Sequence, residues 1–150
     1  MNQPTKNDDR HLLLLDGHAL AFRSWFTDAS VASGFFSLLN GAIDKYRPSH
    51  VAVAFDPPPP TFRHHLYPDY KANRPPVPAD FLEECAGVEE RLDKDKTYRV
   101  SCPGYEADDV IGTLARQAAL MGLEVTILTC DLDLLQLVSD SVCVEVFSQY

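Results

Sequence analysis

The amino-acid sequence predicts an α/β fold in which a mainly parallel central sheet is flanked by helices. Short apolar runs of strand length alternate with longer segments of helical periodicity, and this alternation is typical of parallel sheets joined by crossover helices. Three of the apolar runs end immediately before an aspartate, at Asp16, Asp56 and Asp131. Because the carboxyl ends of parallel strands meet at one edge of the sheet, where ligands bind, we expect these three side chains to converge.

Each expected strand and helix follows from its own pattern. Strands are expected where apolar runs are bounded by turn residues, at 11–16, 51–56, 98–102, 125–130 and 142–147. Helices are expected at 18–27, 33–46, 79–93, 105–121 and 132–138. The 105–121 segment has apolar residues at i, i+3 and i+4 spacing and closes at Gly122. The proline-rich segment from Pro57 to Pro78 is expected to be a loop.

A chain of 150 residues is expected to form one domain, at 11–150, behind a flexible polar tail at 1–10. Apolar residues make up 45% of the sequence, well above the range of disordered chains. The sequence has no signal-peptide core and no apolar run approaching the roughly 20 residues that span a bilayer. We therefore expect no membrane partner and a cytoplasmic location. The four cysteines, at positions 85, 102, 130 and 143, lack metal-binding spacing and are expected to be buried, reduced thiols.

A further group of acids opens the expected helix at 105–121 and adds to the three aspartates at the strand ends. With these, and with the acid two positions after Asp131, the expected metal ligands are Asp16, Asp56, Glu106, Asp108, Asp109, Asp131 and Asp133. Carboxylates gathered this closely repel one another, which raises their pKa values and costs stability unless cations are present. The pattern therefore predicts a divalent-metal site.

Two simpler explanations account for parts of this pattern. Acids in a first helical turn are stabilised by the helix macrodipole whatever the protein does, and this applies to 106–109. Aspartates after strands are also common N-caps of the following helix, and Asp131 is placed to cap the helix at 132–138. Neither explanation covers three strand ends and a helix start that are all acidic at one predicted edge, so metal binding is the preferred interpretation.

The net charge of −9 argues at first against a nucleic-acid partner, since phosphate binding depends on Lys and Arg. The seven clustered acids account for most of the excess, because the other 15 acidic residues nearly balance 13 basic ones. Basic and aromatic side chains are interleaved within a dozen positions, at Arg63, His64, His65, Lys71 and Arg74 with Phe62, Tyr67 and Tyr70. This mixture is typical of a phosphate-binding and base-stacking surface, although a solvated polar loop would have a similar composition.

A shell made only of carboxylates favours Mg²⁺ or Mn²⁺ as the cofactor, because hard cations prefer oxygen, and it disfavours the neighbouring histidines as ligands. Phosphodiester hydrolysis is the reaction that such sites serve best, with two ions activating a water and stabilising the leaving oxygen. A nearby cation would offset the charge that develops on the phosphate. The expected catalytic cations are Lys71, Arg74 and Arg23.

Six short strings carry a resemblance to a known family. They are Leu15-Asp16-Gly17-His18, Val53-Ala54-Phe55-Asp56, Thr61-Phe62-Arg63-His64, Tyr70-Lys71-Ala72-Asn73-Arg74-Pro75, Pro103-Gly104-Tyr105-Glu106-Ala107-Asp108-Asp109 and Leu128-Thr129-Cys130-Asp131-Leu132-Asp133. In this order the sequence resembles the 5′ to 3′ exonuclease domain of bacterial DNA polymerase I, from about residue 11 to 147. The resemblance implies a PIN-like, resolvase-like fold and a flap endonuclease that removes 5′ ends and flaps from DNA or RNA primers.

The same resemblance implies roles for the matching residues. The seven acids would surround the metal ions. Tyr70, Lys71 and Arg74 would belong to a helical arch that handles the single-stranded 5′ end, and Arg63 would lie on the approach to it. With His64, which we expect to be solvated or to face phosphate, these residues form the expected nucleic-acid-binding set.

The sequence also departs from the family pattern. It ends soon after the strand at 142–147, whereas family members continue into a helix-hairpin-helix half that clamps duplex DNA. That half is expected to be absent here, or supplied by a separate chain. The connection at 28–33 is short, Lys94-Asp95-Lys96 stands where apolar residues are usual, and Leu132 replaces a customary basic residue. The departures are therefore also compatible with a fragment or a degenerate copy of the nuclease.

Two alternatives come from other functional classes. A non-catalytic nucleic-acid-binding module of the same fold would bind without cleaving. A phosphoacceptor receiver domain also has an acidic pocket at strand ends, but it needs paired acids after the first strand and a lysine after the last. Here Asp16 is followed by Gly17, and no lysine follows Lys96, so the receiver domain is disfavoured.

Overall fold

The computed structural model describes residues 10–27 and 30–148. All but the last residue of the tail expected at 1–10, and part of the connection at 28–33, lie outside the described residues. In chain order the structure contains β1 (His11–Asp16), α1 (Gly17–Thr27), α2 (Val31–Tyr46), β2 (His50–Ala54), α3 (Phe62–Leu66), α4 (Ala79–Lys94), β3 (Tyr98–Val100), α5 (Ala107–Leu120), β4 (Glu124–Thr129), the 3-10 helix η1 (Leu132–Leu137) and β5 (Val142–Val146).

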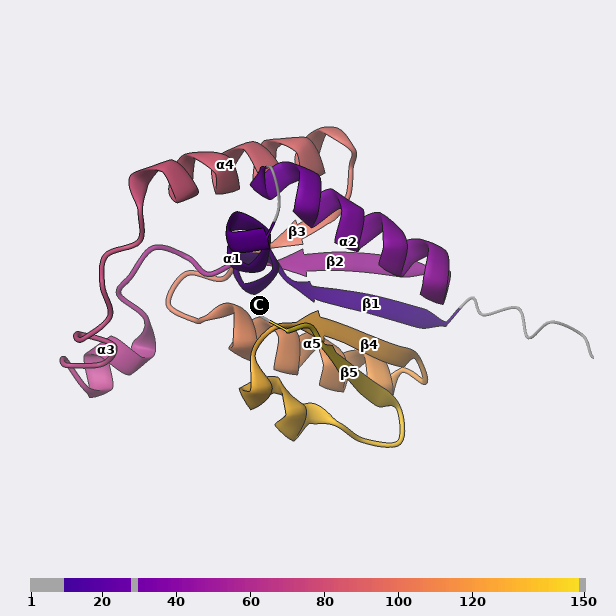
Figure 1. The fold of residues 1–150 in the computed structure, drawn as a ribbon. Helices are drawn as coiled ribbons and strands as arrows, with labels where there is room; N and C mark the ends of the chain where they lie inside the picture. Colours follow the sequence, from indigo (N-terminus) through magenta and orange to yellow (C-terminus); the bar gives the residue numbers. More distant parts are fainter. Residues whose placement is uncertain (1–9, 28–29, 149–150) are drawn as a thin grey trace, which may run out of the picture.

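The strands form one parallel sheet in the order β3-β2-β1-β4-β5. The chain therefore builds the sheet outward from β1 to β3 and then returns to add β4 on the other side of β1. Helices α1, α2 and α4 cover one face, while α5 and η1 cover the opposite face (Figure 1). The predicted α/β fold with a parallel central sheet and flanking helices is confirmed.

The expected strands and helices are all present, and local hydrogen bonds explain the shifted boundaries. Helix α2 begins at Val31 because the Ser30 hydroxyl accepts the N–H of Ser33 at 3.1 Å and caps the helix. Helix α5 begins at Ala107, since Glu106 is its extended N-cap residue. The segment expected as a helix at 132–138 is the tighter 3-10 form.

The expectation of a continuous loop from Pro57 to Pro78 is wrong at α3. Five residues, Phe62–Leu66, form a short helix there. The backbone N–H of Thr61 donates to Nδ1 of His64 at 3.0 Å, and the N–H of His64 donates to the carbonyl of Thr61 at 3.0 Å. These reciprocal contacts close the first turn, and a helix this short leaves no apolar periodicity in the sequence.

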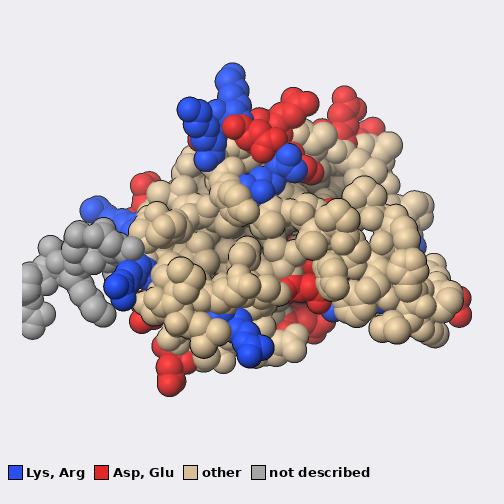
Figure 2. Space-filling model, turned by 180° about the vertical axis from the view of Figure 1, so that it is seen from behind, with Lys and Arg blue, Asp and Glu red and all other residues tan. Residues whose placement is uncertain are grey.

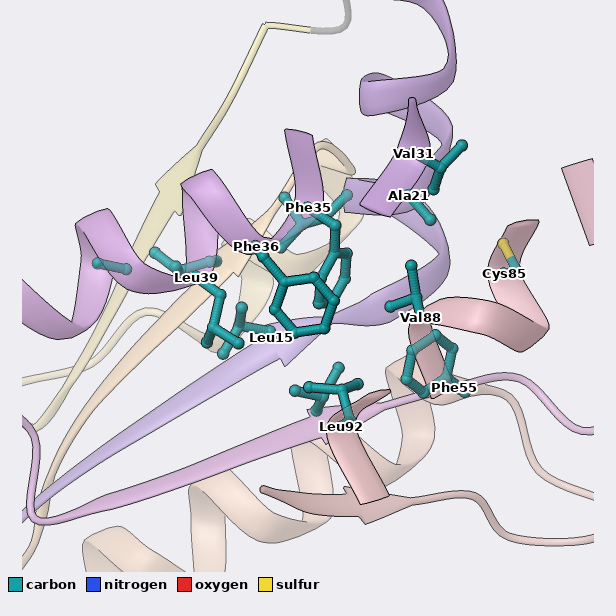
Figure 3. Close-up of a cluster of buried hydrophobic side chains, with 14 of the residues drawn as sticks. Leu15, Ala21, Val31, Phe35, Phe36, Leu39, Phe55, Cys85, Val88 and Leu92 are labelled. Atoms are coloured by element: carbon teal, nitrogen blue, oxygen red, sulfur yellow. The ribbon is translucent and has the colours of Figure 1, made fainter. Parts of the chain in front are cut away.

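The larger core lies between the sheet and the layer of α1, α2 and α4. Its buried side chains come from β1, β2 and all three helices, and Figure 3 shows Leu15, Phe35, Phe55, Val88 and Leu92 among them. A second core lies under α5 and η1 on the opposite face, where α5 contributes Ala107, Ile111 and Ala115. Packing on both faces holds the sheet rigid and so fixes its carboxyl edge, where the three strand-end aspartates are found.

Two of the four cysteines differ from the prediction. Cys85 and Cys130 are buried, reduced thiols as expected, and burial raises their pKa values to about 12 and about 11. Cys102 and Cys143 are reduced as well but lie exposed, because β3 ends at Val100 and because Cys143 alternates with the buried Val142 on the edge strand β5. Within the described residues, no helix is both long and apolar enough to cross a membrane.

The turn from β1 into α1 requires glycine, which gives a first testable prediction. A Cβ at Gly17 would lie 2.6 Å from the ring of Phe55 and 2.8 Å from the carbonyl oxygen of Ala54. Because that ring is fully packed in the core, Gly17→Ala is expected to lower the free energy of unfolding by about 1–3 kcal/mol in urea denaturation.

Gly41→Ala is the matched control for this substitution. An added Cβ at Gly41, within α2, would meet no heavy atom within 4 Å, so the change is expected to stabilise the helix by about 0.5–1 kcal/mol. Equal unfolding midpoints for the two variants would show that the contact with Phe55 can relax at no cost.

Candidate active site

The strand order places a crevice beside the end of β1. The chain leaves β1 toward β2 on one side and returns to β4 on the other, and ligands bind outside the carboxyl ends of the strands where such a reversal occurs. Asp16 ends β1, and Thr129 ends the neighbouring β4. The Thr129 hydroxyl donates to Oδ2 of Asp16 at 2.9 Å, which ties the two strand ends together.

Asp16 is almost entirely buried, with 5% of its surface exposed. Its Oδ1 accepts the N–H of Ala19 at 3.2 Å, so it also caps the first turn of α1. Burial raises the pKa of Asp16, and the nearby Asp56 adds to the rise, despite the hydrogen bonds from Thr129 and Ala19. Burial disfavours the charged form of a carboxyl group, so a positively charged ligand bound beside Asp16 would stabilise its carboxylate.

Asp56 lies directly beyond β2 and is held by groups from two helices. Its Oδ1 accepts the N–H of Ala107 at 2.7 Å. Its backbone N–H donates to Nδ1 of His18 at 3.1 Å, and the same nitrogen lies 3.5 Å from Oδ2 of Asp56. Burial acts to raise the pKa of Asp56, but the imidazole, the Ala107 N–H and Lys71 together hold it below its usual value.

His18 was not expected among the functional residues. Its ring packs edge-on against Phe55 at 5.3 Å between centroids, and it lines the same cavity as Asp16 and Asp56. Its position two residues after the strand-end Asp16 carries no chemical information alone, and the signal that could have found it was its place in the family-like string Leu15-Asp16-Gly17-His18.

The first turn of α5 supplies three acids in different environments. Glu106 is buried at the N-cap position. Asp108 faces the other carboxylates, and burial together with the charges of Asp16, Asp131, Asp56 and Glu106 raises its pKa to about 7. Asp109 points to Arg63, whose guanidinium holds the pKa of Asp109 below its usual value. The predicted convergence of the α5 acids with the strand ends is therefore seen most directly at Asp108.

Asp131 and Asp133 lie beyond the end of β4. Asp131 caps η1, because its Oδ1 accepts the N–H of Asp133 at 2.8 Å, as the N-cap explanation predicted. Its own N–H donates to the Thr129 hydroxyl at 3.0 Å, so a short chain of hydrogen bonds runs from Asp131 through Thr129 to Asp16. The side chain of Asp133 is exposed and lies outside the cavity.

Most of the clustered acids line one cavity of about 1040 Å³ at the carboxyl edge of the sheet. Five of the seven expected metal ligands line it, namely Asp16, Asp56, Glu106, Asp108 and Asp131. All three expected catalytic cations, Arg23, Lys71 and Arg74, line it as well. Seen from behind, acidic atoms lie in a recess to the right of the centre, and Lys and Arg are scattered over this face (Figure 2).

The expected nucleic-acid-binding residues divide into two groups. Lys71 and Arg74 face the cavity. Arg63, His64 and Tyr70 make internal contacts: Arg63 binds Asp109, His64 accepts the Thr61 N–H, and the Tyr70 hydroxyl donates to Glu106 at 3.0 Å.

Lys71 and Arg23 already have partners. Nζ of Lys71 donates to Oε1 of Glu106 at 2.7 Å, and although burial acts to lower the pKa of Lys71, this bond raises it above its usual value. Nε of Arg23 donates to the carbonyl of Ser148 at 3.0 Å. The Lys71 ammonium therefore stays charged, and a phosphate that approaches it meets an ion pair with Glu106 already in place.

The donor set fits a hard divalent cation, although no closed shell is formed. Within 10–27 and 30–148, no group of three or more His, Cys, Asp or Glu side chains is close enough to hold one ion. Glu106 and Asp109 point to Lys71 and Arg63 instead of to the other acids. Burial and neighbouring carboxylates raise the pKa values of Asp16 and Asp108, and a cation bound between these two acids would stabilise their charged forms.

Comparisons with known proteins agree with this arrangement. A family model described as 5′-3′ exonuclease, N-terminal resolvase-like domain, matches residues 11–149. DNA polymerase I of Thermus thermophilus, described as thermostable, is 43% identical over 143 residues, which cover 89% of this chain and 17% of that one. DNA polymerase I of Chloroflexus aurantiacus is 42% identical over 151 residues, covering 93% of this chain and 16% of the other.

A solved structure confirms the PIN-like, resolvase-like fold. The bacteriophage T5 D15 flap endonuclease, in a pseudo-enzyme–product complex with DNA and metal ions, superposes with a TM-score of 0.78 at 24% identity and covers 92% of this chain and 55% of the phage enzyme. This chain thus spans less than a fifth of its polymerase relatives and about half of the phage enzyme. The receiver-domain alternative is set aside by the family match.

Proposed function

The chain belongs to the family of 5′-3′ exonuclease N-terminal, resolvase-like domains, and on that premise we propose that it is a divalent-metal-dependent nuclease. Its proposed reaction is hydrolysis of phosphodiester bonds at the 5′ ends or flaps of DNA, with RNA primers as a further substrate. The observation that carries the proposal is the cavity at the carboxyl edge of the sheet, where five carboxylates face three cations.

The proposed metal ligands are the five acids that line the cavity, Asp16, Asp56, Glu106, Asp108 and Asp131. Mg²⁺ or Mn²⁺ bound there would supply the charge that activates a water and stabilises the leaving oxygen. Asp133 does not line the cavity, and its backbone N–H donates to Oδ1 of Asp131 in the cap of η1. The likeness to a flap endonuclease solved with DNA and metal ions supports the choice of cofactor and substrate.

The cations in the cavity have separate proposed tasks. Lys71 and Arg74 follow the exposed segment 66–69 and face the acids, so they are placed to bind the phosphate that undergoes cleavage and to offset its developing charge. Arg23 lies on α1, on another side of the same cavity, and would bind a neighbouring phosphate. Opposite charges around one hollow explain how a chain with net charge −9 can accept a polyanion.

A cleavage assay tests the proposed function directly. The chain is incubated with a 5′-labelled flap duplex in Mg²⁺, in Mn²⁺ and in chelator, beside the variant Asp108→Asn. Short 5′ products are expected with either metal, and none in chelator or with the variant. Binding of the flap without cleavage in any metal would replace the nuclease with a nucleic-acid-binding module of the same fold, and metal-independent cleavage would contradict the carboxylate site.

A further inference from the structure

The segment that carries Lys71 is held to the rest of the molecule mainly by polar contacts. Helix α3 contains no buried residue and lies apart from both helical layers (Figure 1). The contacts that tie it down come from the turn at 104–109: the N–H of Phe62 donates to the carbonyl of Gly104 at 2.7 Å, and the Phe62 ring packs against Tyr105 at 5.4 Å. Because apolar burial is slight, directed polar bonds must set the position of this segment.

The best directed of these bonds join Arg63 to Asp109. Nη1 and Nη2 of Arg63 donate to the two carboxylate oxygens of Asp109 at 2.6 and 2.7 Å, a bidentate geometry that fixes orientation as well as distance. The side chains are only 30% and 23% exposed, so water competes weakly. Oδ2 of Asp109 also accepts the N–H of Glu106 at 2.9 Å. Both oxygens of Asp109 are therefore occupied by groups of this chain, and Asp109 does not line the acidic cavity.

A second attachment lies at Glu106, the N-cap residue of the same helix. Glu106 receives Lys71 on Oε1 at 2.7 Å and Tyr70 on Oε2 at 3.0 Å, and Nη1 of Arg63 lies 3.5 Å from the same Oε2. Arg63 thus contacts both Glu106 and Asp109, and Lys71, which lines the cavity, is paired with Glu106. If Arg63 were released, the segment would keep only the bonds of Lys71 and Tyr70 to Glu106 and the contacts of Phe62 with the 104–105 turn, and it buries little apolar surface.

We propose that Arg63 and Asp109 form a latch that positions Lys71 at the acidic cavity, and that Asp109 is a positioning residue and not a metal ligand. This inference rests on the proposed nuclease function, in which Lys71 meets the phosphate. In this proposal Arg63 binds Asp109 of the same chain and does not make the nucleic-acid contact expected from the sequence.

Amide hydrogen exchange across 62–74 tests the latch without any substrate. Asp109→Asn and Arg63→Gln are each expected to speed exchange in this segment at least tenfold, and the double variant to add nothing further, because each single change already breaks the same contact. Arg63→Lys, which keeps one ion pair, should recover most of the protection. Asp95→Asn, which breaks the remote pair with Arg91 on α4, is the matched control and should leave 62–74 unchanged. Unaltered exchange in both latch variants would overturn the proposal.

Titration with Mn²⁺ separates the two roles of the acids. Asp109→Asn is expected to keep the parent's Mn²⁺ dissociation constant within threefold, while Asp108→Asn weakens it at least tenfold. The proposal would be overturned if Asp109→Asn lost as much Mn²⁺ affinity as Asp108→Asn while Arg63→Gln lost none. Asp109 would then be a metal ligand.

Flap cleavage supplies the third readout. Both latch variants should lower kcat at least tenfold with KM within threefold, since Lys71 is displaced while the acids remain. An unchanged kcat in both latch variants would overturn the latch. A parent chain that binds Mn²⁺ but cleaves nothing would contradict the proposed function instead, and exchange and titration would still decide the latch.

Discussion

Replacing Asp108 by asparagine is expected to raise the melting temperature of the metal-free protein and to weaken its binding of divalent ions at least tenfold. Burial and four neighbouring carboxylates raise the pKa of Asp108 to about 7, so its charge opposes folding at neutral pH. Removing that charge should stabilise the metal-free fold by about 1–2 kcal/mol, a figure reduced for partial contact with solvent. For a chain of this size the gain corresponds to about 2–8 °C in Tm.

The pH dependence of stability has a definite sign. Because the pKa of Asp108 is higher in the folded state than its ordinary value of 3.8, the folded protein binds more protons than the unfolded chain between these values. The free energy of unfolding in chelator should therefore fall as the pH rises from about 4 to about 7. The Asp108→Asn variant should lose less stability than the parent over the same range.

Thermal melts in chelator between pH 4 and 8, repeated with Mn²⁺, measure both effects. Asp44→Asn is the matched control, because Asp44 is exposed on α2 and remote from the cavity. A lower Tm for Asp108→Asn in chelator would show that the carboxylates do not repel one another and would remove the main support for a cation site.

Replacing Lys71 by alanine is expected to slow flap cleavage about 100-fold, the usual effect of removing one group that stabilises developing charge. The same change should strengthen Mn²⁺ binding by about threefold, since it frees Glu106 from an ion pair of the kind worth less than about 1 kcal/mol. Activity and metal affinity thus move in opposite directions. Rapid-quench kinetics and calorimetric titration on one preparation give both values.

Lys94→Ala controls for the loss of a positive charge. Lys94 ends α4 and does not line the cavity, so neither cleavage nor Mn²⁺ affinity should change. Should Lys71→Ala cleave at the parent rate, the segment 62–74 would be a solvated scaffold. Should it weaken Mn²⁺ binding, Lys71 would serve the metal site and not the phosphate.

The strands and their acidic ends could be predicted because the signals are local. An apolar run bounded by turn residues predicts a buried strand, and an aspartate directly after it must lie at the carboxyl edge. This reasoning predicted that Asp16, Asp56 and Asp131 lie close together, and all three line one cavity. The prediction succeeded because all strands of a parallel sheet end at the same edge.

Pairings between distant residues could not be predicted in this way. Arg63 and Asp109 are 46 positions apart, and composition alone made Arg63 a candidate for phosphate and Asp109 a candidate for metal. The Arg63 guanidinium and the Asp109 carboxylate form an ion pair, and only the folded structure shows this pairing. Helix α3 escaped prediction because its five residues bury nothing, so no apolar periodicity was required of them.

The two cores lie on opposite faces of the sheet, whereas the cavity lies at its edge. Among the acids proposed to act there, Asp16 and Glu106 are buried. The apolar side chains that form the cores are distinct from the acids that line the cavity, although Asp16, Asp56 and Asp131 also accept backbone N–H groups. The cavity can therefore be altered without repacking either core, provided that each replacement of these three acids keeps a hydrogen-bond acceptor. This makes the domain a suitable scaffold for engineering new binding sites.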